Sequence, residues 1–237
     1  MAAVEQKSNE ITAVPQLLEG RDLSGTVTTM DALLTQRSLA QQILDQKGHY
    51  LMIVKQNQSE LYDAIALLFE LPPWLREERD QEYRVHHTVD KGHGRLETRT
   101  LETSNTLCDY LDWPGVEQVM RRRCRRVNLK TGEVSTQTTY GITSMPWTEV
   151  DAAQIEALWR AHWTIENRVH YVRDVTMSEG ACQMRTGHAP QVLAALRNII
   201  LSLFRWKGWQ NIADALRYCA ACFRRSLELI SASPDGL

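Results

Sequence analysis

The sequence has 237 residues, of which 43% are hydrophobic and 24% charged, and its formal net charge is −2. This length and apolar content fit one large domain, or a domain with an insertion, with an ample core. The balanced charge excludes a uniformly basic surface, so any binding of nucleic acid must depend on local clusters. We find no long apolar run and no signal-like start, and therefore expect a soluble, cytoplasmic protein.

The first strong pattern predicts a strand, a helix and a second strand. The β-branched stretch Thr26–Met30 predicts a buried strand, and Asp31 follows it directly. Helical spacing runs from Leu33 to Lys47 and stops at Gly48, and Tyr50–Val54 is a second apolar strand. Such a βαβ unit has parallel strands, so Asp31 should lie at the carboxyl edge, where ligand sites of these sheets are found.

The middle of the chain is predicted to be rich in strands, after a helix at Ser59–Glu70. Alternating patterns predict strands at Tyr83–Val89, Arg95–Glu102, Glu117–Leu129 and Val134–Ile142. The sequence KTGE at 130–133 indicates a hairpin between the last two. We interpret this block as an insertion, not as a separately tethered domain.

Helices are predicted near both ends of the chain. A short one should start near Pro15, and helical patterns then run from Thr148, where Thr148 and Asp151 suggest a capping box. Pro190 should start a second long helix that ends before Gly208. Two more helices are expected at Asn211–Tyr218 and Ala220–Ile230.

The stretch from Trp159 to Arg185 combines helical periodicity with unusual polar groups. At about 100° per residue, one arc roughly 100° wide is apolar and predicts a buried face. Its members are Ile155, Leu158, Ile165, Val169 and Val172. An adjoining arc of roughly 80° holds a carboxylate, two imidazoles, a guanidinium and an indole. Its members are Trp159, His162, Glu166, His170 and Arg173.

That pattern resembles the third acidic motif of the DDE transposases, in which Tyr, Arg, Glu and Lys are separated by two, three and six residues. Here the same spacings join Trp159, His162, Glu166 and Arg173. The longer string HWTIENRVHYVRDVT resembles the H-repeat-associated (ISAs-type) branch of bacterial insertion-sequence transposases. Further matches to that branch are KSNEITAVPQLL, VTTMDALLTQ, YLMIVKQNQ, GHGRLETR and RTGHAPQVLAALRN, from about Lys7 to Leu203.

The resemblance implies an α/β fold with a partial RNase H-like (retroviral-integrase-like) core, a β-rich insertion and a C-terminal helical region. We assign residues 1–55 to the partial core, 56–147 to the insertion and 148–237 to the helical region. The implied function is metal-assisted DNA cleavage and strand transfer at insertion-sequence ends, with self-association as a further expectation.

Asp31 and Glu166 are the two catalytic and metal-binding carboxylates that the resemblance implies, with Mg²⁺ as cofactor and Mn²⁺ as an alternative. Phosphodiester cleavage by two ions about 4 Å apart needs acidic side chains that converge from separate elements. Asp31 as the N-cap of the following helix is the structural alternative.

The resemblance also implies a first catalytic Asp on an earlier strand, for which this sequence has no candidate. We therefore expect an N-terminally truncated relative that does not cleave or join DNA by itself. The alternatives are a catalytically inactive remnant that still binds DNA, and a metal-dependent nuclease of the same general fold.

The expected DNA contacts come from two groups of side chains. Cations suit phosphate oxygens, and indoles can stack on bases, although aromatic side chains on helices are often core residues. The first group is His162, Arg168, His170 and Arg173, together with Trp159 and Trp163. The second is His93, Arg95 and Arg99 on a predicted strand.

Two arginine-rich patterns leave alternatives open. Arg95, Glu97 and Arg99 share one strand face, which predicts either a phosphate-binding strand or a ladder of ion pairs in which Glu97 is structural. The run RRRCRR at 121–126 predicts either an exposed ribbon that binds a polyanion or a solvated edge strand.

Overall fold

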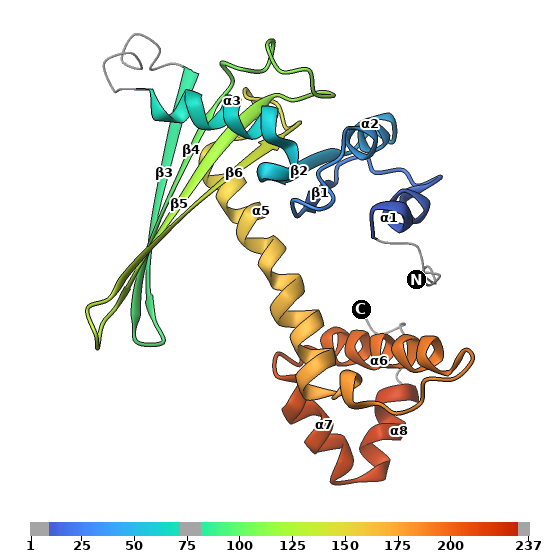
Figure 1. The fold of residues 1–237 in the computed structure, drawn as a ribbon. Coiled ribbons are helices and arrows are strands. Elements are labelled where there is room, and N and C mark those ends of the chain that lie inside the picture. The colour runs from blue at the N-terminus through green and yellow to red at the C-terminus, as the bar shows by residue number, and fades with distance from the viewer. Residues whose placement is uncertain (1–9, 72–81, 232–237) are drawn as a thin grey trace. The chain divides into compact units, whose positions relative to one another are not determined.

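The computed structural model describes residues 10–71 and 82–231, except for the side chains of residues 10 and 165–167. Six strands form one mixed sheet in the order β1-β2-β6-β5-β4-β3 (Figure 1). Their bounds are β1 Val27–Met30, β2 His49–Val54, β3 Tyr83–Gly92, β4 Arg95–Ser104, β5 Gln118–Asn128 and β6 Val134–Thr143. β1 and β2 are parallel and every other pair is antiparallel. The predicted α/β class, the βαβ unit and the later hairpin are thus confirmed.

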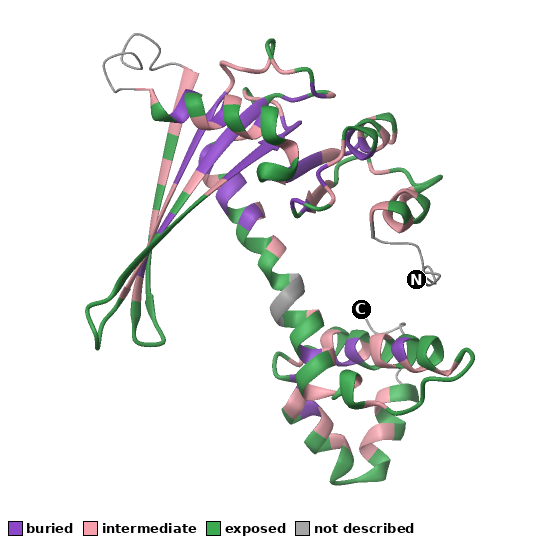
Figure 2. Cartoon of the chain, viewed as in Figure 1, coloured by how far each residue is buried: buried purple, intermediate pink, exposed green. Residues whose placement is uncertain are grey.

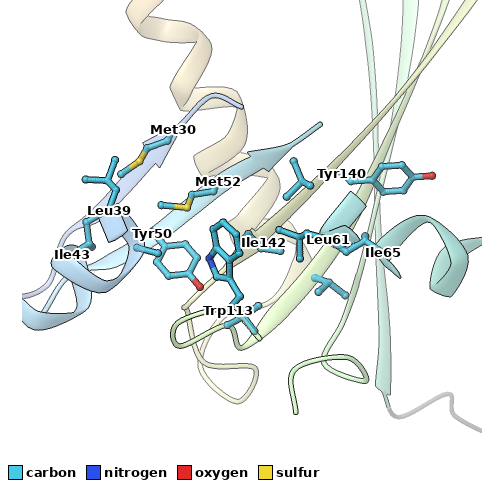
Figure 3. Packing of buried hydrophobic residues seen from close by; sticks show 14 of the residues in the cluster. Met30, Leu39, Ile43, Tyr50, Met52, Leu61, Ile65, Trp113, Tyr140 and Ile142 are labelled. Atoms are coloured by element: carbon cyan, nitrogen blue, oxygen red, sulfur yellow. The ribbon is translucent and has the colours of Figure 1, made fainter. Parts of the chain in front are cut away.

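Strand β2 forms the centre of the core because both of its faces are buried. Tyr50, Met52 and Val54 point into a cluster that α2 (Arg37–Asp45) and α3 (Ser59–Glu70) cover (Figure 3). Leu51 packs on the opposite face against the start of α5 (Ala152–Ile165). Burial on both faces explains why this strand is continuously apolar. The far ends of the long strands β3 to β6 are mostly exposed (Figure 2).

Three helix starts differ from the prediction. α1 (Glu10–Leu18) begins before Pro15, so the proline lies inside the helix. One backbone hydrogen bond is missing there, because proline has no N–H. α2 begins at Arg37 instead of Leu33, because the residues before it form a turn. The capping box of α5 is Asp151 with Gln154, each side chain accepting the other residue's amide at 2.9 and 2.8 Å, and does not involve Thr148.

The chain divides into two compact units, residues 2–162 and 163–237. The first contains the whole sheet, in which the pairing of β2 with β6 joins strands from the predicted core and the predicted insertion. The division of the chain into three parts stays a prediction. The RNase H-like core also stays a prediction, and a six-stranded mixed sheet flanked by helices is consistent with it.

The second unit is helical, as predicted. It contains α6 (Ala189–Trp206), α7 (Ile212–Ala220) and α8 (Phe223–Ser231). Its small core includes Val172, Leu201 and Phe204. None of the described helices is long and apolar enough to cross a membrane.

The indole of Trp159 packs helix α5 onto the sheet. Trp159 is only 2% exposed and packs over Gly141 of β6. A Cβ on Gly141 would lie 2.9 Å from the Trp159 ring and 3.0 Å from the carbonyl oxygen of Met52, so only glycine leaves room for this contact. One turn earlier, Glu156 accepts two hydrogen bonds of 2.8 Å from Arg122 of β5.

The arginine run of β5 is neither an exposed ribbon nor an edge strand, because β4 and β6 pair with it on its two sides. Arg121 is buried and binds Glu102 through two hydrogen bonds, and it donates a third to the carbonyl of Phe69. Neighbouring arginines therefore fasten opposite faces: Arg121 contacts the end of α3, and Arg122 contacts α5. The expectation of a polyanion-binding strand is wrong for these two residues.

Replacement of Gly141 should show how much the packing of Trp159 against this glycine contributes to stability. We expect Gly141→Ala to lower the free energy of unfolding by about 1–3 kcal/mol, because the added methyl overpacks the contact with the indole and the Met52 carbonyl. Urea denaturation monitored by tryptophan fluorescence measures this change. Gly92→Ala, also in a strand but with nothing within 4 Å of the added Cβ, is the control and should change stability little. Equal effects of the two substitutions would contradict the assignment.

Candidate active site

Asp31 lies immediately after β1, at the carboxyl edge of the parallel pair, as predicted. The residue is exposed, and its Oδ1 accepts the amide of Leu34 at 3.2 Å. Asp31 is not the N-cap of α2, which begins only at Arg37. The carboxylate thus stabilises a tight turn with one oxygen, and its other oxygen faces no recorded partner within residues 10–71 and 82–231.

Hydrogen bonds with β2 and with the segment after it hold this turn in place. The hydroxyl of Thr35 donates to the carbonyl of Ile53 at 2.6 Å. Asn57 Nδ2 donates to the carbonyl of Ala32 at 2.6 Å, and Gln58 Nε2 donates to that of Thr35 at 2.9 Å. The Asp31 turn is therefore bound to its neighbours at two of its residues, Ala32 and Thr35. Such preorganisation is what a metal-binding carboxylate needs.

His162 is the last residue of α5 that belongs to the first unit, and its side chain contacts strand β1. Its Nδ1 lies 2.9 Å from the hydroxyl of Thr29, two residues before Asp31. Both side chains are partly buried. This hydrogen bond fixes the last turn of α5 that belongs to the first unit against β1.

Beyond His162 the helix changes character, which corrects the predicted faces. Regular α-helix ends at Ile165, and π-helical turns follow at Glu166–His170 and Val172–Thr176. A π-helix makes i→i+5 hydrogen bonds, as Met177 does to Val172, so a count of 100° per residue fails here. The single predicted apolar face is in fact two: Ile155 and Leu158 join the core of the first unit, and Val169 and Val172 that of the second.

Glu166 begins the first π-helical segment, in the second unit. Its side chain is outside the described part of the structure, so the predicted pairing with Asp31 stays a prediction. π-helical turns inside α-helices are frequent at functional sites, which makes Glu166 a notable position on backbone grounds as well. Among the described side chains, no group of three or more His, Cys, Asp or Glu could hold a metal ion.

Comparison with known proteins assigns the family. The model of the transposase DDE domain matches residues 1–203. The chain belongs to the DDE transposase family. It is 34% identical to a putative transposase YncI of Escherichia coli O157:H7 over 208 residues, which are 85% of this chain and 51% of the relative. It is 31% identical to the H repeat-associated putative transposase YhhI of Escherichia coli K12 over 209 residues, 84% of this chain and 52% of the relative.

These relatives confirm the H-repeat-associated branch that the sequence suggested. The chain spans about half the length of these curated relatives. DDE transposases as a family bind DNA and use divalent metal ions. The identity of the metal and the residues that hold it are matters for the proposal below.

The side chains near Glu166 in the sequence that we expected to contact DNA differ in whether they are exposed and unpaired. The expectation that Trp159 stacks on a base is wrong, because its indole is buried. Gly141 has no side chain, which leaves room for the indole against the sheet. Trp163 is 58% exposed. Arg173 is bound by Glu179 through hydrogen bonds of 2.6 and 2.7 Å, which lower the pKa of Glu179. Arg168 and His170 are also exposed, and Arg168 donates a hydrogen bond to Gln210.

The residues of the long β3–β4 hairpin show that the ion-pair interpretation is correct for Glu97. Glu97 is buried and lies 2.8 Å from Arg99, 3.0 Å from Arg126 and 3.7 Å from Arg95. Arg99 also pairs with Asp90, so its guanidinium is largely occupied within the fold. Arg95, with a side chain 54% exposed, remains accessible. His93, in the turn, is exposed with φ of 49°.

The sequence alone did not point to Thr35, Asn57 and Gln58 as site residues. The available signals were the strings VTTMDALLTQ, which contains Thr35, and YLMIVKQNQ, which contains the other two; both matched the family as a whole. Their role as hydrogen-bond donors to carbonyl groups depends on which loops the sheet brings together, and spacing does not reveal that.

Loss of one tie should loosen the Asp31 turn without unfolding the sheet. We expect Asn57→Ala to cost about 1 kcal/mol of local stability and to accelerate hydrogen exchange at the Leu34 amide, which Asp31 binds. Hydrogen exchange followed by NMR or mass spectrometry measures this. Gln56→Ala, an exposed neighbour with no recorded side-chain partner in the described chain, is the control. Unchanged exchange in Asn57→Ala would refute the tie.

Glu97 should contribute stability that depends on pH. Burial by itself would raise the pKa of Glu97, but hydrogen bonds from Cys124 and Arg126 and the charge of Arg99 outweigh burial and lower it. A carboxylate with a lowered folded-state pKa stabilises the fold above its unfolded pKa of about 4.3, and this contribution is lost as pH falls through the folded-state value.

We therefore expect Glu97→Gln to be less stable than the parent by about 2 kcal/mol at neutral pH, with a difference that shrinks below about pH 4.3. Thermal unfolding measured across this pH range tests the expectation. Glu133→Gln, at an exposed position in the β5–β6 turn, should show little difference at any pH. A destabilisation of Glu97→Gln that is constant with pH would mean that its charge is not the cause.

Proposed function

We propose that this chain supplies Asp31 and Glu166 as two carboxylates of the catalytic centre of an insertion-sequence transposase with an RNase H-like core. The reaction is hydrolysis of a phosphodiester bond at the end of the element, followed by attack of the freed 3′ hydroxyl on target DNA. Mg²⁺, or Mn²⁺ in its place, supplies Lewis-acid stabilisation of the phosphate in such reactions. The two carboxylates would hold the cations, since oxygen ligands are the type that Mg²⁺ prefers.

The hydrogen bond between Thr29 and His162 is the observation that best supports this proposal. It ties the strand that ends at Asp31 to the helix that continues to Glu166. Glu166 follows His162 by four residues, about one helical turn along the chain. The exposed Asp31 carboxylate, held in a turn by neighbouring loops, is suited to bind a hard cation.

A second group of cations is proposed to bind the DNA backbone away from the reacting bond. At the turn end of β4 and β5 a 480 Å³ pocket is lined by His93, Arg95, Arg126 and Lys130. Glu133 also lines the pocket. The cations Arg95, Arg126 and Lys130 outnumber this one carboxylate, so the local charge is positive. Such a cluster fits phosphate contacts that position DNA without reading its sequence.

The alternative is a protein that binds DNA without cleaving it. Its support is the exposed cationic pocket of His93, Arg95 and Lys130, which would bind phosphate groups whether or not the two carboxylates hold an ion. Measurements on Asp31 and Glu166 distinguish these possibilities, because a non-catalytic DNA-binding protein has no need for the two carboxylates to share an ion.

Manganese binding should reveal a shared site. We expect Asp31→Asn and Glu166→Gln each to weaken Mn²⁺ binding in the presence of DNA, and the double variant to be weakened by less than the sum. Two ligands of one ion are coupled, with an interaction free energy on the order of 1–3 kcal/mol. Calorimetry or electron paramagnetic resonance of the four proteins measures this cycle.

Asp109→Asn and Glu228→Gln are the matched controls, since both positions are exposed and each lies in the same unit as its counterpart. Neither should change Mn²⁺ binding. Strictly additive effects of Asp31→Asn and Glu166→Gln, or none, would reject the shared centre and favour the protein that only binds DNA.

A further inference from the structure

A pocket of about 600 Å³ adjoins the Asp31 turn and lies wholly within the first unit. Ala32 and Leu33, directly after Asp31, form one wall, and Val54 with the residues after β2 forms another. The third wall comes from β6: Tyr140 pairs with Val54, the last residue of β2, so Thr138 and Thr139 continue past the end of that strand. The position beyond the carboxyl ends of two parallel strands is where such sheets bind ligands.

The lining of this pocket suits an anionic ligand with a flat polar ring. Lys55 is its cation, and the described lining contains no carboxylate. Within residues 10–71 and 82–231, Lys55 has no ion-pair partner, and the side chain of Gln56 has no hydrogen-bond partner. Tyr62 and Leu33 add apolar surface, and Leu33 is 45% exposed without a ligand to cover it.

The pocket is also held in shape before any ligand binds. Asn57, one of its lining residues, donates a hydrogen bond to Ala32, another lining residue, at 2.6 Å. Tyr62 packs edge-on against Tyr140 with ring centroids 5.0 Å apart. A volume within the range of about 300–1,000 Å³ is typical of sites for small ligands, and a nucleotide unit belongs to that size class.

We propose that this pocket, the strand-end pocket, holds one unpaired nucleotide of the DNA strand whose phosphodiester lies at Asp31. Lys55 binds a phosphate oxygen of that nucleotide. The amide and hydroxyl groups of Gln56 and Thr138 bind the edge of the base, and Tyr62 and Leu33 contact its face. The identity of the ligand as DNA rests on the proposed function, whereas the chemistry of the pocket is independent of it.

Binding of two labelled duplexes tests this proposal. One duplex is blunt, and the other is identical except for an unpaired strand end; fluorescence anisotropy in Mg²⁺ gives both affinities. We expect the parent chain to prefer the unpaired end by about tenfold, on the scale of one base contact. Thr138→Trp, which fills the pocket, and Lys55→Gln should both remove this preference.

Matched controls separate the pocket from general effects. Thr136→Trp places the same side chain two residues earlier on the same face of β6, also at an exposed position. Lys47→Gln removes a charge just before the amino end of β2, whereas Lys55 follows its carboxyl end. Both controls should keep the preference. Unfolding curves that match the parent show that each variant is folded.

Each outcome decides something different. Loss of the preference in Thr138→Trp and Lys55→Gln alone supports the strand-end pocket. Equal affinity of the parent for the two duplexes, or a preference that both pocket variants retain, overturns it while duplex binding still supports the proposed function. Failure of every duplex to bind overturns both.

Competition distinguishes a strand end from a free nucleotide. Deoxyadenosine monophosphate should displace the duplex with an unpaired end more effectively than inorganic phosphate, but should bind more weakly than that duplex. Tighter binding of the free nucleotide would overturn the assignment to DNA. Equal competition by phosphate would mean that Lys55 binds a phosphate only and that no base is held.

Discussion

The contact between Trp159 and Gly141 is the constraint on which the arrangement around Asp31 depends. The indole packs where the strand has no side chain, and two hydrogen bonds between Arg122 and Glu156 hold the preceding turn of α5 to the sheet. One turn beyond the indole, His162 reaches Thr29 of β1. Within the first unit, a helix fixed at three successive points has a defined direction along the sheet up to His162, beside the strand that ends at Asp31.

The second feature of the site is that its loops support each other. Thr35, Asn57 and Gln58 donate their hydrogen bonds to backbone carbonyl groups across the gap between the β1 and β2 ends. The bond from Asn57 to Ala32 also shapes the strand-end pocket, because both residues line it. A centre for charged ligands gains from such fixed polar groups, since a mobile carboxylate would pay an ordering cost on each binding event.

Charge in this chain is used mainly for structure. Most arginines of β4 and β5 are neutralised by buried or half-buried carboxylates: Glu97 contacts Arg99 and Arg126, Glu102 contacts Arg121, and Glu156 contacts Arg122. A net charge of −2 is consistent with that pattern. In the proposed function, affinity for DNA comes from the smaller set of cations without carboxylate partners in the described chain, such as Lys55, His93 and Lys130.

The sequence by itself determined the strands, most of the helices and the family. Apolar periodicity placed the strands around Asp31 and the helix Ser59–Glu70, because both depend on local patterns of burial. It also predicted the pairing of Glu97, whose arginine neighbours share its strand face. Only the tertiary structure decided that Trp159 is a core residue, that the arginine run is an inner strand, and that Asn57 supports the Asp31 turn. These facts depend on which residue of a distant strand or loop lies opposite, as Gly141 does beneath Trp159, and spacing along one element contains no information about that partner.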